Sequence, residues 1–360
     1  MKKAAFWVIL CSTGIVFSSC KKGDDESSYA IATASLSVSP VDTSQVSGLV
    51  PLGNLNPPGH TFPTDHMYFY FKNPGVSVPV YAPGNLHIFQ ISRFRNNPGT
   101  PGATEDYSID FGSQSGTLLY FSHVSSLSPA LLAAADAFSG ASCESYSTGG
   151  STIEFCRKSV SLDINAGDII GSGNEVAGQF ALDMGFRVNN IAVCPLDYFN
   201  AGTKVKLEAK LGNSNGTVKR ITAPICGEYN QDLSGTLQGN WYKQGVPRSP
   251  EDAHIAFVKD NVEPEKLRIS IGSAVPGLPS AVYHFTQTGA GVIDRPFISV
   301  TNTGQIFCYN PLYYYGAPVP GTSIIVKLED NGTLSFEKRN CDCSCNLPYA
   351  FSAAKISYTR

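Results

Sequence analysis

The sequence predicts an all-β protein with two β domains. Its 360 residues include 34 glycines and 23 prolines, which divide the chain into short segments. Many of these segments alternate apolar and polar residues, which is the period of a half-buried strand. Only 129–138 predicts a helix, because a Ser-Pro start precedes alanines and leucines there. We expect a β-sandwich or barrel domain, followed by a second antiparallel β-barrel-like domain.

The alternating segments place the individual strands. They lie at 67–71, 86–94, 107–111, 117–121, 204–211, 255–258, 267–271, 297–301 and 323–328. The composition changes near 222–238, and we therefore divide the chain into domains at 48–225 and 226–360.

The first twenty residues predict export. Lys2 and Lys3 precede an apolar stretch over 4–17, and two serines then lead to Cys20. This stretch is too short to cross a bilayer about 30 Å thick as a helix. The segment 17–20 resembles a lipobox, which implies a signal peptide over 1–19 and a membrane-attached lipid (palmitate among its acyl chains) on Cys20. The alternative is an ordinary signal peptide that is cut nearby, with Cys20 incidental.

The residues after Cys20 are polar and charged, and such a run cannot bury enough surface to order itself. We assign 20–47 to the lipidated cysteine and a flexible tether. The acidic residues in it resemble the surface-export tags of some lipoproteins. The predicted location is the cell envelope, at the outer membrane and on its surface.

The overall composition narrows the class of function. Hydrophobic residues make up 42% of the chain, which is enough for a core. Charged residues make up 15% and the net charge is −3, which argues against nucleic acid as a partner.

The cysteines indicate an oxidising compartment. Without Cys11 and Cys20, the predicted mature domains keep eight, an even number that suggests disulfides. Proximity in sequence suggests Cys143–Cys156, Cys194–Cys226, and a bridge from Cys308 to one of Cys341, Cys343 and Cys345. A metal site in this last trio is the alternative, although the Cys-x-x-Cys spacing of structural zinc is absent.

Four motifs follow one another in the first domain. They are Val-Tyr-Ala-Pro-Gly at 80–84, Tyr-Phe-Ser-His-Val-Ser at 120–125, Ala-Gly-Asp-Ile-Ile-Gly at 166–171 and Ala-Leu-Asp-Met-Gly-Phe at 181–186. In this order they resemble the lysostaphin-type zinc endopeptidases, whose β-sandwich domain is called the duplicated hybrid motif. The resemblance implies that fold here, and peptidoglycan as the surface acted on.

The resemblance also marks positions for zinc. The family's first His ligand falls on His66, its Asp ligand on Tyr70, and its His-x-His pair on Ala181 and Asp183. A further catalytic His of the family falls on His123. Two of the family's functional side chains are therefore replaced by Tyr70 and Ala181, which implies a degenerate active site.

Two interpretations of these residues stay open. His66, Asp183 and His123 can form a rebuilt site of two histidines and one carboxylate, with Asp65 and His60 nearby in sequence, because catalytic zinc needs three protein donors. The alternative is a metal-free cleft in which these residues serve structure or ligand binding. Asp183 is the strongest single candidate, since alternation turns it away from its apolar neighbours.

The second domain offers weaker signals. Gly-Asn-Trp-Tyr at 239–242 resembles the first strand of lipocalin-like barrels, although a Trp there is usually a core residue. A tyrosine cluster at Tyr309 and 313–315 suits either sugar stacking or packing. His254, His284 and Asp294 form no recognisable catalytic set.

Three functions are consistent with the sequence. The first is an envelope lipoprotein whose peptidase-like domain binds peptidoglycan, a glycan or a protein partner without catalysis or a cofactor. The second is a divergent zinc hydrolase that acts on cell-wall peptide. The third is a structural or ligand-carrying lipoprotein.

Overall fold

The computed structural model describes residues 29–112, 116–176, 178–310, 312–314, 317–345 and 347–360. The proposed signal peptide, Cys20, the 21–28 segment and Tyr315 lie outside these residues. The structure is 42% strand and 10% helix, which confirms the all-β prediction. None of the helices it describes is long and apolar enough to span a membrane.

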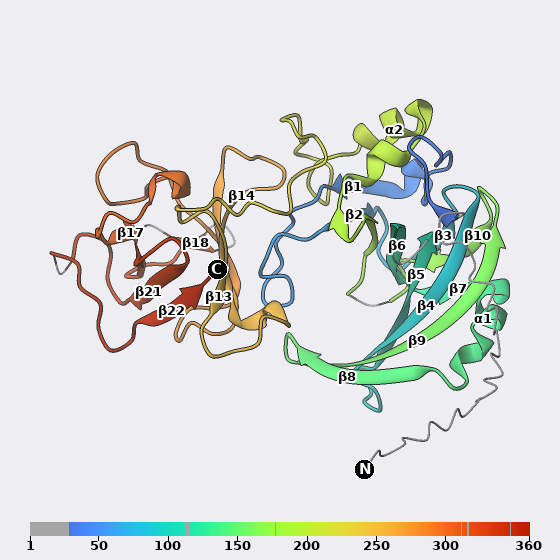
Figure 1. Ribbon diagram of the computed structural model, residues 1–360, viewed down its shortest axis with the longest axis horizontal. Coiled ribbons are helices and arrows are strands. Elements are labelled where there is room, and N and C mark those ends of the chain that lie inside the picture. The colour runs from blue at the N-terminus through green and yellow to red at the C-terminus, as the bar shows by residue number, and fades with distance from the viewer. Residues whose placement is uncertain (1–28, 113–115, 177, 311, 315–316, 346) are drawn as a thin grey trace, which may run out of the picture.

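The N-terminal domain is built on a strongly curved nine-stranded antiparallel sheet (Figure 1). Its order is β1-β2-β11-β6-β5-β4-β9-β8, with β12 paired to β11. These strands are β1 (Val46–Val50), β2 (His66–Phe71), β4 (Leu86–Asn96), β5 (Thr104–Gly112), β6 (Thr117–Val124), β8 (Ser142–Thr148), β9 (Ser151–Ile164), β11 (Ala181–Val188) and β12 (Ile191–Ala192).

A three-stranded sheet packs against the large one. It consists of β3 (Val78–Tyr81), β10 (Ile169–Gly173) and β7 (Ser126–Leu127), in the order β3-β10-β7. Apolar side chains of both sheets share one core, with Phe69 from β2 and Val80 from β3 both fully buried. Met67, Phe69 and Phe71 of β2 point into this core, so alternation turns the other side chains of β2 to the opposite face.

Part of the segment predicted as a tether belongs to the N-terminal domain. Residues 29–47 were assigned to the tether, but Ile31, Leu36 and Val41 are buried in the N-terminal core. The tether prediction is therefore wrong for 29–47. The three apolar side chains supply apolar surface that can be buried, which the charged residues before them lack. Helix η2 (Thr43–Gln45) leads from here into β1.

The helix predicted at 129–138 is present as α1 (Pro129–Ala134) and η3 (Asp136–Phe138). The strand predicted at 204–211 is wrong, since α2 (Ala201–Glu208) lies there, after η4 (Pro195–Tyr198). Asn200 caps α2 by accepting a hydrogen bond from the amide of Thr203. Val205 is 65% exposed, so the apolar alternation there did not mark a buried face.

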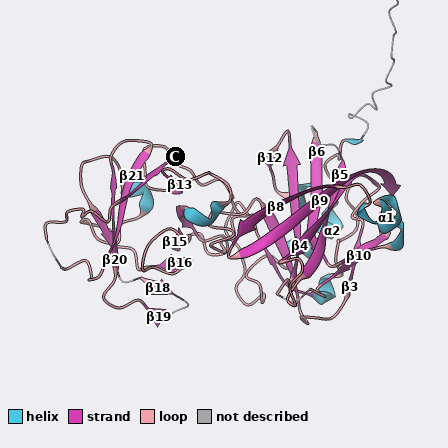
Figure 2. Cartoon of the chain, turned by 90° about the horizontal axis from the view of Figure 1, so that it is seen from below, coloured by secondary structure: helices cyan, strands magenta, loops and turns pink. Residues whose placement is uncertain are grey.

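The C-terminal domain is a ten-stranded antiparallel sheet of order β17-β20-β21-β22-β13-β14-β15-β16-β18-β19 (Figure 2). Its strands are β13 (Gly239–Lys243), β14 (Ile255–Lys259), β15 (Leu267–Ile271), β16 (Ala281–His284), β17 (Phe307–Tyr309), β18 (Tyr313–Tyr314), β19 (Ala317–Pro318), β20 (Ser323–Leu328), β21 (Thr333–Arg339) and β22 (Ile356–Thr359). Helix η5 (Glu251–Ala253) precedes β14, and η6 (Phe297–Ser299) replaces the strand predicted at 297–301.

Aromatic side chains fill the interior of this second domain. Trp241 is fully buried, donates from its indole to the carbonyl of Leu237 and stacks under Arg360. Phe257, Phe297 and Tyr309 pack around one another in the same core. Trp241 is therefore a core residue.

Four disulfides form among the described residues. Cys143–Cys156 and Cys194–Cys226 form as predicted, and Cys308 bridges to Cys343. Cys341 pairs with Cys345, so all three cysteines of the C-terminal trio are engaged in disulfides and the alternative of a metal site there is wrong. Cys226 belongs to the N-terminal core, which places the domain boundary just after it.

Candidate functional site

Three neighbouring strands bring the candidate residues to one face of the large sheet. Strand β11 lies between β2 and β6, and Asp183 is the cross-strand partner of both Tyr68 and Ser122. Cross-strand partners share a face, so Asp183 lies on the side opposite the core. His66, two residues before Tyr68, shares this face.

His123 reaches this face through an irregularity in β6. The register between β5 and β6 shifts opposite this residue, and the backbone φ of His123 is 62°. A regular strand would turn His123 into the core, beside fully buried Phe121. The bulge turns it to the side of Ser122 instead, and buried Val124 then resumes the core pattern.

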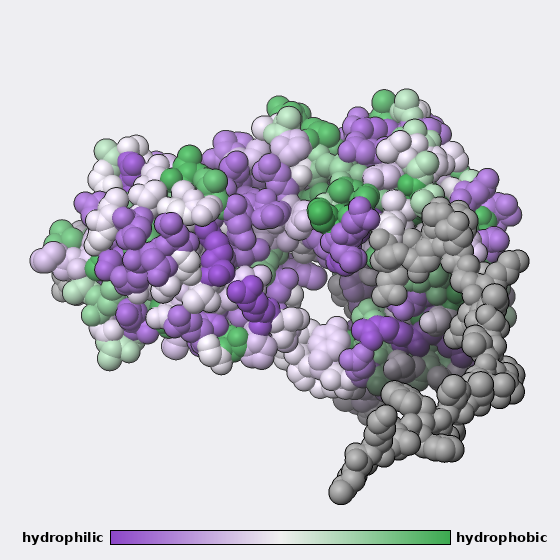
Figure 3. Space-filling view, viewed as in Figure 1, coloured by the Kyte–Doolittle hydropathy of each residue, from purple (hydrophilic) through white to green (hydrophobic). Residues whose placement is uncertain are grey.

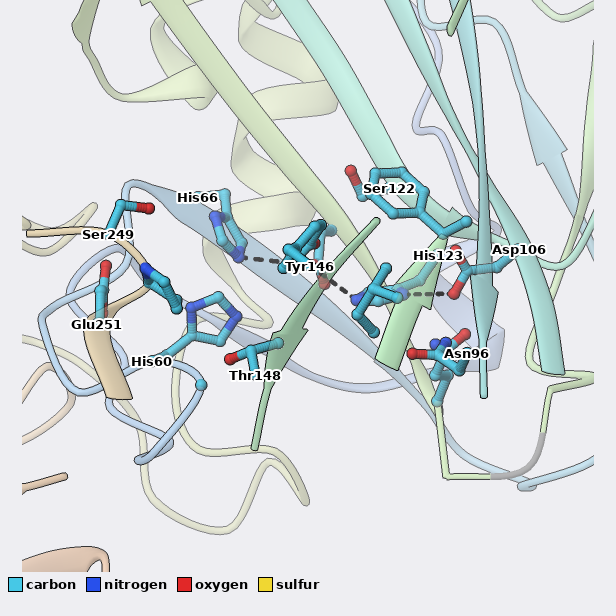
Figure 4. A pocket seen from close by; sticks show the side chains of 16 residues that line it. His60, His66, Asn96, Asp106, Ser122, His123, Tyr146, Thr148, Ser249 and Glu251 are labelled. Carbon is cyan, nitrogen blue, oxygen red and sulfur yellow. Dashed lines mark hydrogen bonds and ion pairs between the residues drawn. The ribbon is translucent and has the colours of Figure 1, made fainter. Parts of the chain in front are cut away.

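The two histidines converge on one carboxylate oxygen. The Nε2 atom of His66 is 3.3 Å from Oδ2 of Asp183, and the Nε2 atom of His123 is 3.5 Å from the same oxygen. In Figure 4 a dashed line runs from His66 and another from His123 into the space between the two rings. Asp183 is only 3% exposed, so water does little to screen it.

A second carboxylate holds the far nitrogen of each imidazole. Nδ1 of His66 lies 3.1 Å from Oδ1 of Asp65, and Nδ1 of His123 lies 2.9 Å from Oδ2 of Asp106. Asp65 is itself held by Arg187, whose Nη2 donates to it at 2.6 Å. The rings are therefore fixed with both Nε2 atoms facing Asp183.

Neighbouring charges shift the pKa values of the residues in this site. Burial lowers the pKa of His66, but Asp183 and Asp65 outweigh burial and raise it to about 9. Asp183 and Asp106 likewise outweigh burial at His123 and raise its pKa to about 9. Burial acts to raise the pKa of Asp65, but hydrogen bonds and charges from His66 and Arg187 hold it well below its usual range.

The donor set fits a metal ion. Each imidazole donates its Nδ1–H to a carboxylate. Each Nε2 then faces Asp183 either as an N–H group or with a lone pair. A lone pair on Nε2 and one on Oδ2 of Asp183 repel each other unless a proton or a metal ion lies between them. Nε2 of His66 and Oδ1 of Asp183 are buried without a hydrogen-bond partner. The site therefore calls for either protons or a metal ion.

The two histidine–aspartate distances are close to those between the ligands of a zinc ion. Two donors of a tetrahedral zinc, each bonded at about 2.1 Å, lie about 3.4 Å apart, close to the 3.3 and 3.5 Å found here. Among the described residues, no three His, Cys, Asp or Glu side chains already surround one point as a complete ligand set. Metal binding at His66, His123 and Asp183 would thus require these side chains to move.

The site opens into a cavity of about 430 Å³ between the two domains. His60 lies at its edge, with its ring centroid 5.6 Å from that of His66. Burial and the neighbouring His66 lower the pKa of His60 to about 4. Glu251 comes from the C-terminal domain, and burial raises its pKa to about 7.

Beside the site, aromatic side chains occupy the same face. Tyr70 lies opposite Ala181 across β2 and β11, and both pack with Tyr68 and Val50 in a small apolar cluster. Tyr70 and Ala181, two of the positions at which the sequence departs from the zinc-binding pattern, are therefore neighbours, and both are built into packing.

The structure brings together all five candidates taken from the sequence, His60, Asp65, His66, His123 and Asp183. Sequence analysis missed Asp106, Arg187 and Glu251. Asp106 alternates with Ser108 along β5, which is the signal that could have placed it on the cleft face. His254 is buried and stacks on Phe62, which marks it as a packing residue.

Comparison with known proteins adds no identification. No family model matches the chain, and no curated protein matches it either.

Proposed function

We propose that this chain is a lipid-anchored protein of the cell envelope, and that its cleft binds zinc and hydrolyses a peptide bond of the cell wall. One observation carries the proposal: His66 and His123 are each oriented by a carboxylate on Nδ1 and aim Nε2 at a single oxygen of Asp183. Carboxylates that orient ligating histidines in this way are typical of metal sites.

The residues of the cleft can supply the remaining chemistry. A zinc ion held by His66, His123 and Asp183 would lower the pKa of bound water to about 7 and polarise a carbonyl. His60 is neutral at pH 7, because its pKa is about 4, so its imidazole is free to accept a proton. It lines the same cavity as the three donors.

The anchor and the substrate class rest on the sequence. Residues 17–20 resemble a lipobox, and the four motifs of the first domain resemble those of lysostaphin-type endopeptidases. Both observations support a site that faces peptidoglycan from a membrane-attached protein.

Non-catalytic binding of peptidoglycan, a glycan or an envelope protein is the second candidate. It is favoured by Tyr70 and Ala181, which replace two functional side chains of the peptidase pattern and pack together in an apolar cluster. In this alternative the polar cleft binds a ligand and performs no hydrolysis.

Metal content separates the two candidates. The protein beginning at Lys21 should be purified without chelator or histidine tag and its zinc measured by mass spectrometry. We expect about one equivalent, lost in His66→Ala and in Asp183→Ala. His87→Ala is the matched control, because His87 also pairs with an aspartate, Asp163, but lies outside this cleft.

Zinc-loaded protein should then release new amino groups from purified sacculi, and His60→Ala should slow this release. Absence of bound zinc after zinc has been added would exclude the hydrolase. Bound zinc with sacculus binding but no release would leave the binding role.

A further inference from the structure

Strand β8 and the first half of β9 form a long arm beside the cleft. Six of the seven residues of β8 are exposed, whereas Ile153 and Cys156 of β9 are buried. Cys143 and Cys156 are cross-strand partners within it, and their disulfide fixes its register. Figure 1 shows the arm reaching from the N-terminal domain towards the C-terminal one.

The tip of the arm is fastened to η5 of the C-terminal domain. Thr148 donates from Oγ1 to Oδ1 of Asp252 at 2.6 Å, and the amide of Gly149 donates to the other oxygen at 2.6 Å. The carboxylate of Asp252 thus accepts hydrogen bonds from both Thr148 and Gly149 at the tip of the arm.

The neighbouring residue of η5 holds the opposite wall of the cleft. Oε2 of Glu251 accepts a hydrogen bond from the amide of Phe62 at 2.9 Å. The ring of Phe62 is buried in the C-terminal domain, stacked on His254 and packed against Tyr242. Glu251 and Asp252, adjacent in sequence, therefore join the two walls.

These contacts close a ring around the cavity. Its lining comes from the segment with His60, from the arm at Tyr146 and Thr148, and from Ser249 and Glu251 of the C-terminal domain. In the space-filling view, an opening passes through the molecule between the two domains, above the arm (Figure 3). His66, Asp183 and His123 line the cavity that this ring encloses.

We propose that the ring encloses an extended polymer strand, which enters sideways when the arm tip separates from Asp252. The inference rests on the proposed function and specifies its ligand as an internal stretch of a long chain. A long chain without a nearby end cannot thread a closed ring, whereas a short fragment can enter through its openings.

The arm is the side of the ring that opens. The contact at Phe62 buries an aromatic ring that is 6% exposed, and separating it would expose apolar surface to water. The contact at Asp252 consists of two hydrogen bonds, and Gly149 in it is exposed. Water can replace these two bonds, so the tip of the arm leaves Asp252 more easily than Phe62 leaves its packing, while residues 153–159 of β9 stay paired with β4.

A lockable variant tests this proposal. Thr148→Cys with Asp252→Cys places two thiols where the side chains now touch, and oxidation would close the ring covalently. The probes are intact purified sacculi and soluble fragments prepared from them with a muramidase. We expect the oxidised variant to bind fragments as its own reduced form does and to lose at least tenfold in binding to sacculi relative to that reduced form. The two single cysteine variants are the controls.

Sacculus binding that is unchanged by oxidation would contradict the proposal that the ring must open to admit a polymer strand. If the wild type binds neither probe, the proposed function fails, and hydrogen exchange then decides on the arm separately. We expect the amides of 142–152 to exchange faster in Asp252→Ala and slower in the locked variant, with that of Phe62 unchanged. Equal exchange of the arm in wild-type and locked protein would show that it does not open.

Discussion

Gly185 on β11 leaves room for the ring of Tyr120 on β6. The two residues are cross-strand partners, and a Cβ atom at residue 185 would lie 2.1 Å from Cζ of Tyr120. The Tyr120 hydroxyl donates to Oδ1 of Asp65 at 3.1 Å, and this same oxygen contacts His66. The missing side chain at Gly185 therefore lets a tyrosine support the carboxylate that orients a site histidine.

Gly185→Ala should displace Tyr120 and lower the free energy of unfolding by about 1–3 kcal/mol, the usual cost of overpacking. Urea denaturation measures this. Gly102→Ala is the control, because no atom lies within 4 Å of a Cβ there, and a change within about 0.5 kcal/mol is expected. Equal effects of the two substitutions would contradict the packing argument.

Asp106→Asn should weaken zinc binding roughly 10–100-fold, since loss of a carboxylate that orients a ligating histidine typically has this effect. Competition with a chromophoric chelator gives the affinity. Asp163→Asn removes a similar carboxylate, 2.8 Å from Nδ1 of His87, and should leave zinc affinity unchanged. An equal loss in both variants would argue against a specific role for Asp106.

Without metal, stability should fall as the pH rises towards 9. The pKa of His66 is about 9 in the folded protein and about 6.5 in an unfolded chain. Its protonated form stabilises the fold fully below pH 6.5, and this contribution is lost as the pH passes through the folded value. Unfolding free energies measured with chelator between pH 6 and 10 should show this slope, and His66→Gln should reduce it. Parallel curves for the two proteins would refute the assignment.

The two disulfides of the N-terminal domain should differ in their effects. Cys194 and Cys226 are 32 residues apart, and Cys143 and Cys156 are 13 apart. Chain entropy alone gives about 4 kcal/mol for the longer loop and about 3 kcal/mol for the shorter one. Cys226 and Cys156 both lie in the core, so each disulfide has one buried sulfur and loop length decides the ranking. Paired Cys→Ser variants, compared by thermal unfolding, should rank in this order, and the reverse order would contradict it.

Phe62→Ala should loosen the two domains. Phe62 is 6% exposed and packs with Ala256 and Val258 of the second domain. We expect a loss of about 3–5 kcal/mol and a larger radius of gyration in small-angle scattering. Phe180→Ala is the control, because Phe180 is 37% exposed. An unchanged scattering curve for Phe62→Ala would mean that other contacts fix the domains.

Sequence reasoning located the site better than it described its surroundings. His66 was placed by the resemblance to the zinc endopeptidases, and Asp183 by the same resemblance and by alternation along its own strand, which is a local property. Alternation along β5 could have placed Asp106 on the cleft face, but its contact with His123 depends on strand pairing, and Glu251 reaches the site only through domain contact. In the segment 204–211, Val205 and Leu207 alternate with charged residues, and this pattern predicts a strand. The segment is helical instead, because the cap at Asn200 starts a helix there.

By itself, the sequence determined the all-β class, the position of seven strands and the nearest cysteine pairs, because period-two alternation and short separations act over a few residues. Only the tertiary structure decided that His66, His123 and Asp183 meet. That meeting depends on the order β2-β11-β6, on cross-strand register and on a bulge at His123 that reverses the direction its strand position predicts. Register and bulges are set by pairing between segments far apart in the chain, and no single segment contains that information.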